Sequence, residues 1–272
     1  MVRKELLSVS IGNFINYNQS TIIMLPIAIK AAKEAGKILM KHYNKSQIVY
    51  KGEHFDAASI LTQADIESEK KIVEILKKNF SDHNIFSEEA VQENKGSEYS
   101  WYIDPLDGTS NFARNIPLFG ISIGLVKNNR AILGVLYFPA LGLLLKAEKN
   151  KGAFANGKKI TVSNRELKKS LYYSGGYYKG KLQLEKTIGD KVGLVKVIDV
   201  SSYEFAQIAM GDAELYILTN ILHDVVGGVI IVREAGGKVT DYDGLEWNLQ
   251  SKGIVASNKV IHDDVVKLLK NV

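Results

Sequence analysis

Residues 101–112, WYIDPLDGTSNF, join an apolar strand directly to two carboxylates that stand three residues apart. Pro105 has no amide hydrogen and favours an extended conformation at Asp104, while Gly108 permits a tight turn. Thr109 can then begin a helix whose free amides attract phosphate. The segment therefore predicts a metal and a phosphate side by side at a strand end, although an isolated Asp-Pro-x-Asp-Gly match also fits a surface turn.

Acidic residues also stand beside two other apolar segments of the chain. The pair Glu88-Glu89 follows a short apolar strand, and Asp224 precedes an apolar helix. Each has a simpler interpretation, because Glu88 could belong to a solvated acidic loop that ends at Glu93, and Asp224 could be a helix N-cap. The functional interpretation depends on the three acidic elements meeting in one place.

A single oxygen-rich site would contain Glu88, Asp104, Asp107 and Asp224. Two carboxylates about 5 Å apart repel by roughly 3 kcal/mol at an effective dielectric constant of 20, so such a site requires bound cations or raised pKa values. Cysteine is absent, and the five histidines show no ligand-like spacing and are expected to have packing or surface roles. The predicted metal ligands are therefore oxygen atoms. Mg²⁺ suits these ligands, and a metal pair about 4 Å apart would stabilise phosphoryl transfer.

The composition is typical of a globular protein, with 272 residues, of which 46% are hydrophobic and 24% charged. The net charge of +5 comes from Lys and Arg spread along the chain, so a basic nucleic-acid-binding module is a weaker alternative that leaves the acidic residues unexplained. Polar residues interrupt the stretch Ser8–Ile29 too often for a membrane span or a signal peptide. These features predict a cytoplasmic protein.

Hydrophobic periodicity predicts two helices and then a β-rich layer in the first half. A helix is expected over Ile27–Tyr43, a loop over Lys51–Ser59, and a second helix from Thr62 and Asp65 to about Phe80. The buried face of the second helix is predicted to contain Ile66, Val73, Leu76 and Phe80. The short apolar runs that follow are typical of an antiparallel sheet and include Tyr102–Asp104, Ile121–Val126 and Ile132–Phe138.

The second half alternates between the two patterns without a linker or an internal repeat. Gly236-Gly237 ends the last predicted helix. The expected strands are Ser170–Ser174, Leu194–Val200, Glu214–Leu218, Lys238–Asp241 and Gly253–Ser257, and the expected helices are Lys181–Ile188, Tyr203–Met210 and His223–Ala235.

Taken together, these motifs resemble the inositol monophosphatase and fructose-1,6-bisphosphatase superfamily in order and spacing. The resemblance rests on Ile103–Phe112, Glu88-Glu89, Thr62–Asp65 and the Asp224 helix with its end at Glu234-Ala235-Gly236-Gly237. It implies a layered αβαβα sandwich of the α/β (α+β) class. It also implies one domain over residues 24–272, with halves 24–155 and 156–272, and leaves residues 1–23 as an extension that we expect to be dispensable.

The resemblance implies a Mg²⁺-dependent phosphatase with two or three Mg²⁺ per site. The implied metal ligands are Glu88, Asp104, Asp107 and Asp224 through their side chains and Leu106 through its carbonyl. Asp65, Thr109 and Glu88 would be catalytic, with Asp65 and Thr109 activating the nucleophilic water. Gly108, Thr109 and Ser110 would bind the phosphate through helix-start amides, and residues 51–59 correspond to a loop that helps recruit a further metal.

The substrate is less well defined by the resemblance, because several positions depart from the family pattern. Ser87 replaces a usual glycine, His223 an aromatic residue and Val226 a small one, while Ile217 aligns with an acid that contacts a substrate hydroxyl in the animal enzymes. The expected substrates are polyol or sugar phosphates, such as inositol monophosphate or fructose 1,6-bisphosphate. The alternative is a 3′(2′),5′-bisphosphate nucleotidase acting on phosphoadenosine phosphate. The expected partners are a small metabolite and a second copy in a homodimer, with no nucleic acid or membrane.

Overall fold

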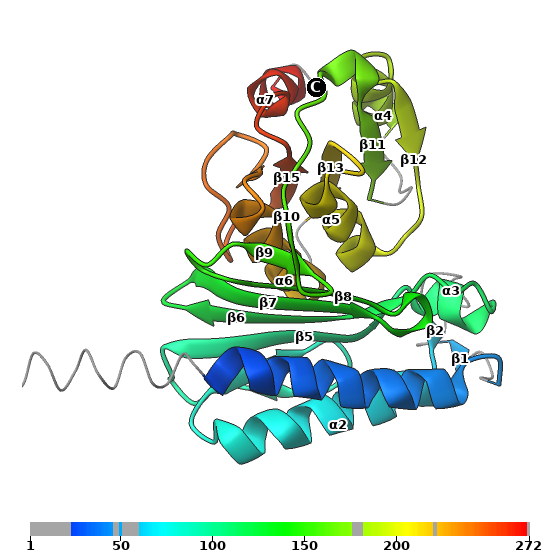
Figure 1. Cartoon of the computed structure of the whole chain (residues 1–272), viewed down its shortest axis with the longest axis vertical. Helices are drawn as coiled ribbons and strands as arrows, with labels where there is room; N and C mark the ends of the chain where they lie inside the picture. Colours follow the sequence, from blue (N-terminus) through cyan, green and yellow to red (C-terminus); the bar gives the residue numbers. More distant parts are fainter. Residues whose placement is uncertain (1–22, 46–48, 51–59, 176–181, 220–221, 271–272) are drawn as a thin grey trace, which may run out of the picture.

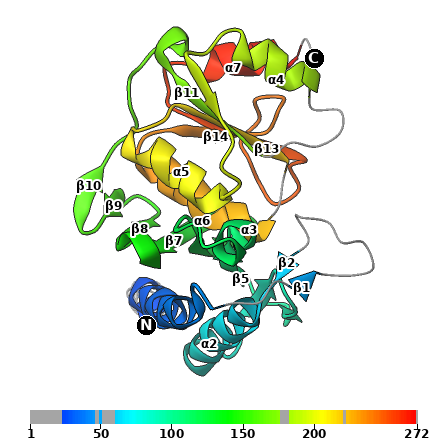
Figure 2. The ribbon, with the colours of Figure 1, turned by 90° about the vertical axis from the view of Figure 1, so that its right-hand side faces the viewer.

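The computed structural model describes residues 23–45, 49–50, 60–175, 182–219 and 222–270. Five layers follow one another as helices, sheet, helices, sheet and helices (Figure 1), and Figure 2 shows the same stack after a quarter turn. The predicted αβαβα sandwich is therefore confirmed. The division at residue 155 stays a prediction, and the extension 1–23 lies outside the described residues except for its last residue. Among the described helices, none combines the length and apolar character needed to cross a bilayer.

The first layer contains a helix over residues 23–42 and α2 (Gln63–Asn79), as predicted. Thr62 caps α2, and the side chains of Ile72 and Leu76 lie at the centre of its buried face. Ile66 is 44% exposed, so its predicted burial is wrong. With 3.6 residues per turn, Ile66 lies beyond the edge of the face that Ile72 and Leu76 define, and the buried Ile75 takes part instead.

The second layer is an eight-stranded sheet, in which only the neighbouring strands β3 and β5 are parallel. This arrangement confirms the predicted antiparallel layer and its three predicted strands. A separate two-stranded sheet pairs β1 (Val49–Tyr50) with β2 (Ile60–Leu61), and α3 (Thr109–Ala113) follows β5. In sheet order, the eight strands are β10 (Lys158–Ile160), β9 (Ala153–Ala155), β8 (Leu143–Glu148), β7 (Arg130–Phe138), β6 (Gly120–Lys127), β5 (Tyr99–Asp107), β3 (Asn84–Ser87) and β4 (Gln92–Glu93).

The third layer contains α5 (Ser201–Met210) and α6 (Leu222–Glu234), both predicted from the sequence. The backbone of α6 lies directly on the sheet, because a Cβ atom added at Gly134 would be 2.3 Å from the carbonyl oxygen of Gly227. A Cβ at Gly124 would lie 2.3 Å from Cγ1 of Val226. The α6 backbone can approach the strands this closely only because they carry glycine at these positions. As a result, the start of α6 lies near the end of β5.

The remaining layers are a five-stranded sheet and the outer helices α4 (Leu182–Gly189) and α7 (His262–Leu269). The predicted strand over Leu194–Val200 is shorter than expected, because it pairs only with β11 at the sheet edge and then leads into α5. The other second-half elements match their predictions, while α7 was not predicted. In sheet order, the strands are β12 (Leu194–Lys196), β11 (Leu171–Ser174), β13 (Leu215–Thr219), β15 (Gly253–Ser257) and β14 (Lys238–Thr240).

Candidate metal and phosphate site

The end of β5 changes its register against β6, and this change presents the acidic segment. Asp104 pairs with Ser122 and Asp107 with Gly120, with a shift between the two pairs. Pro105, which has no amide to donate, lies in the shifted segment. The Leu106 amide donates to Oδ1 of Asp104 at 2.9 Å and orients that carboxylate.

Three carboxylates from three different elements converge at this strand end. The oxygens of Glu88, Asp104 and Asp224 all lie within 4.8 Å of one another. Glu88 is placed there because β3 and β5 run parallel, and its amide donates to the Ile103 carbonyl at 3.0 Å. Asp224 lies in the first turn of α6. The structure therefore brings together three of the four acidic side chains predicted to form one site.

The electrostatics of this group favour a bound cation. Burial, and then the charges of Glu88, Asp224 and Asp107, raise the pKa of Asp104 well above its usual range. Burial and the charges of Asp107 and Glu88 likewise raise the pKa of Asp224. Ionised oxygens at this spacing repel strongly unless a cation lies between them, and hard oxygen ligands suit a divalent metal such as Mg²⁺. These carboxylates therefore fit the Mg²⁺ that the sequence predicted.

Asp107, the fourth predicted acid, has a further structural role. Its Oδ2 atom accepts a hydrogen bond from the Ser202 amide at 2.5 Å, which joins the end of β5 to the start of α5. Burial raises the pKa of Asp107 to about 7 against the opposing hydrogen bonds from Ser202, and Glu88 adds to the rise. The sequence contains no pattern that identifies Ser202 as its partner. A metal-binding role for Asp107 stays a prediction.

Asp65 and Thr109, 44 positions apart in the chain, are in contact. The Thr109 hydroxyl lies 3.1 Å from Oδ1 of Asp65 and 2.8 Å from the Leu106 carbonyl oxygen, so one proton has two possible acceptors. The other Asp65 oxygen accepts from the Thr62 amide and hydroxyl, which forms a capping box. Asp65 thus caps α2 and also contacts Thr109. Burial raises the pKa of Asp65 to about 6, so it is mostly ionised at neutral pH.

The predicted phosphate segment begins with a left-handed residue. Gly108 has a φ of 83°, and a Cβ there would lie 2.8 Å from Cγ2 of Val200, so a side chain would be strained and crowded. The helix α3 starts at Thr109, as predicted. Arg114, which sequence analysis did not select, donates to Oγ of Ser110 at 2.7 Å.

The position that aligns with the hydroxyl-contacting acid of relatives lies away from the acidic group. Ile217 is fully buried in the core cluster that contains Ile188, Val265 and Tyr172, so it faces away from the acidic group. Strand alternation turns the Ile217 side chain toward the outer helices, so the position that aligns with the acid lies in the core. The predicted loop over residues 51–59 lies outside the described residues.

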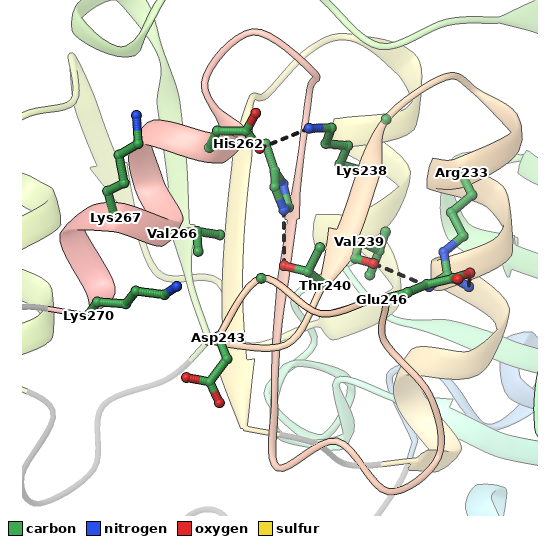
Figure 3. Close-up of a pocket in the computed structure, with 13 residues that line it drawn as sticks. Arg233, Lys238, Val239, Thr240, Asp243, Glu246, His262, Val266, Lys267 and Lys270 are labelled. Carbon is green, nitrogen blue, oxygen red and sulfur yellow. Dashed lines mark hydrogen bonds and ion pairs between the residues drawn. The ribbon is translucent and has the colours of Figure 1, made fainter.

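A cavity of about 640 Å³ between β14, the turn after it and α7 lies apart from the acidic group (Figure 3). Its charges largely neutralise one another, since Lys238 pairs with Asp263 at 2.8 Å and Arg233 with Glu246 at 3.6 Å. His262 is buried and bonded to neighbouring hydroxyls, which confirms its predicted packing role. The cavity contains no member of the acidic group.

The family model described as the inositol monophosphatase family matches residues 23–272. The chain belongs to this family. Members of the inositol monophosphatase family named among its relatives are phosphatases, and the chain is accordingly a phosphoric monoester hydrolase. The family membership confirms the resemblance inferred from the motifs around Asp104 and Asp224.

Individual relatives support the family assignment over most of the chain. A fructose-1,6-bisphosphatase/inositol-1-monophosphatase of Thermotoga maritima is 36% identical over 250 residues, covering 91% of this chain and 96% of that protein. A solved inositol monophosphatase structure from T. maritima has a TM-score of 0.83 at 35% identity, with 91% and 96% of the two chains covered. The Nus factor SuhB of Haemophilus influenzae is 32% identical, covering 90% of this chain and 95% of that protein.

Proposed function

We propose that the protein hydrolyses phosphate monoesters of small polyols or sugars with Mg²⁺. The observation that carries the proposal is the convergence of Glu88, Asp104 and Asp224 within 4.8 Å of one another, next to the contact between Asp65 and Thr109. The T. maritima relative is named for fructose 1,6-bisphosphate and inositol 1-phosphate hydrolysis, which supports the same substrate class here. A cytoplasmic location and a homodimer stay predictions.

The carboxylates of Glu88, Asp104, Asp107 and Asp224, with the Leu106 carbonyl, would hold two or three Mg²⁺. The Leu106 carbonyl oxygen has two lone pairs, so at least one is left for a cation even when Thr109 donates to it. When bound, Mg²⁺ supplies positive charge that stabilises the developing negative charge on the phosphate oxygens.

Residues of the chain itself would transfer the proton, orient the water and hold the phosphate. The Thr109 hydroxyl can donate its proton to Asp65 while its oxygen accepts a proton from the attacking water. Asp65 is mostly ionised at neutral pH and can receive this proton. Glu88, exposed just after β3, would help to orient the water. The amides of Gly108, Thr109 and Ser110 would hold the phosphate at the start of α3.

A phosphate-release panel tests the proposal. Inositol monophosphate, fructose 1,6-bisphosphate and phosphoadenosine phosphate are each incubated with enzyme and Mg²⁺, with Asp104→Asn as the control for contaminating phosphatase. We expect release from the first two and very little from the variant. Preference for phosphoadenosine phosphate would favour the nucleotidase alternative, and equal release by wild type and variant would reject the proposal.

A further inference from the structure

Asp199 stands beside the proposed phosphate segment, in the loop that joins β12 to α5. Asn111 of α3 donates to the carbonyl oxygen of the preceding Ile198 at 3.1 Å. The following Val200 packs over Gly108, as the close approach of its Cγ2 atom shows. The loop is therefore attached on both sides of Asp199 to the segment that would hold the phosphate, and the Asp199 side chain is exposed.

The backbone conformation does not explain why this residue is an aspartate. Asp199 has a φ of 57°, in the left-handed region that few side chains adopt readily. Asparagine is well suited to this region and would satisfy the backbone equally well. In the described part of the chain, every other non-glycine residue with positive φ is an asparagine: Asn44, Asn115, Asn128, Asn129, Asn150 and Asn156.

The contacts of the Asp199 side chain do not explain the aspartate either. Across the described ranges, the structure shows no hydrogen bond or ion pair made by the Asp199 carboxylate. Asp199 is also not one of the three carboxylates that lie within 4.8 Å of one another. The Asp199 carboxylate therefore has no partner among the described residues and lies outside the group of three carboxylates.

We propose that Asp199 recognises the hydroxyl groups of the substrate. A carboxylate accepts hydrogen bonds only, and two neighbouring hydroxyls of a polyol can donate to its two oxygens. This inference rests on the proposed function and narrows its substrate class to esters with free hydroxyls close to the phosphate. The side chain of Ile217, which aligns with the hydroxyl-contacting acid of relatives, lies in the core and cannot bind substrate hydroxyls.

The experiment compares a hydroxyl-rich substrate with one that has no hydroxyl group on its leaving group. Inositol monophosphate and p-nitrophenyl phosphate are assayed with wild type, Asp199→Asn and Asp199→Gly, both of which permit the left-handed backbone. We expect kcat/KM for inositol monophosphate to fall about 10- to 100-fold in Asp199→Gly, mainly through KM, and less in Asp199→Asn. The value for p-nitrophenyl phosphate should stay or rise, because a charge that repels phosphate is removed.

Asp212→Asn provides the matched control, because it removes an exposed negative charge just after the other end of α5. It should leave the ratio of the two kcat/KM values unchanged. An equal loss for both substrates in the Asp199 variants, or no loss for either, would overturn the inference while the proposed function stands. Wild-type enzyme that releases phosphate from neither ester would instead reject the proposed function, and this inference with it.

Discussion

Asp65 uses its two carboxylate oxygens for different purposes. Oδ2 accepts from the amide and hydroxyl of Thr62 and so stabilises the start of α2, whereas Oδ1 contacts the Thr109 hydroxyl. A substitution can therefore separate the two roles. Asparagine keeps one oxygen for the cap, but its amide group presents hydrogens to Thr109 where the carboxylate presents a lone pair.

The first prediction is that Asp65→Asn lowers kcat by ~10² or more with little change in Tm, because general-base assistance of this kind contributes ~10² to 10⁴ in rate. Thr109→Ala should have a similar effect, while Thr109→Ser keeps the hydroxyl and should retain most activity. The double variant should be hardly worse than the poorer single variant. Steady-state kinetics and thermal unfolding measure both quantities, and multiplicative losses would show that the residues act separately.

Glu204 is a second acidic residue whose surroundings determine its protonation. Its side chain is fully buried in α5, near the Tyr216 hydroxyl and the Ile198 backbone. Burial raises the pKa of Glu204 to about 8. Between about pH 5 and pH 8 the folded protein therefore holds a proton that the unfolded chain has released, so this residue lowers the stability as the pH rises through that window.

The second prediction is that Glu204→Gln removes this pH dependence, because glutamine resembles the protonated acid and carries no charge. The difference in unfolding free energy between variant and wild type should grow from pH 5 to pH 8 and then level off, approaching about 1.4 kcal/mol per pH unit in between, and Tm should follow it. Thermal unfolding with Mg²⁺ held constant measures it. Glu166→Gln, on an exposed side chain, controls for the loss of one charge, and a difference independent of pH would contradict the prediction.

At the scale of elements, the contact between α6 and the sheet places the third carboxylate. The strands β6 and β7 carry Gly124 and Gly134 where the helix backbone crosses them. Ser122 also donates from β6 to the Asp224 carbonyl oxygen at 3.2 Å. The helix start is therefore positioned against the same strand whose neighbour, β5, carries Asp104.

The third prediction is that Gly134→Ala displaces α6 and weakens both stability and Mg²⁺ activation. The added methyl group would lie 2.3 Å from the Gly227 carbonyl oxygen, so the helix must move, at a cost of about 1–3 kcal/mol. Gly189→Ala is the control, since its nearest neighbour is Val195 at 3.7 Å and alanine favours a helix. Urea unfolding and Mg²⁺ titration of activity provide the measurements. Equal behaviour of the two variants would be evidence against the packing argument.

For the whole molecule, the proposed metal site joins separate layers of the fold. Glu88 and Asp104 come from the eight-stranded sheet, whereas Asp224 comes from the middle helix layer. A bound cation therefore connects the sheet to the helices above it. Without a cation, the same carboxylates repel one another or hold protons, which weakens the connection.

The fourth prediction is that Mg²⁺ raises Tm and that chelation abolishes activity, with about 2.7 kcal/mol of stabilisation at 100 times Kd. The Tm gain should be larger at pH 8 than at pH 6, because raised pKa values at Asp104 and Asp224 let protons compete with the metal as the pH falls.

The Asp104→Asn variant should lose the increase in Tm that Mg²⁺ produces. Without metal at pH 8, the Asp104→Asn variant should have a higher Tm than the wild type, because the variant lacks a buried negative charge. Full activity in excess chelator would exclude the mechanism.

The amino-acid sequence by itself determined the local features of this protein. Periodicity and turn residues identified α2, the central part of β5, the helix start at Thr109 and the acidic residues at Asp104 and Glu88, because these depend on residues adjacent along the chain. The layered architecture was implied by the family resemblance. The helix α7 was not predicted from the sequence.

Only the tertiary structure decided which distant groups meet. It brought Asp224 and Glu88 within 4.8 Å, where the sequence only grouped them in one site, and it gave Asp107 the Ser202 amide as a partner. It also turned Ile217 into the core and left Asp199 exposed beside the proposed phosphate segment. None of these outcomes has a periodic signal, because each depends on how helices pack on sheets at particular glycines and in a particular register. Propensity acts between neighbours in sequence, whereas packing acts between surfaces that the chain brings together only after folding.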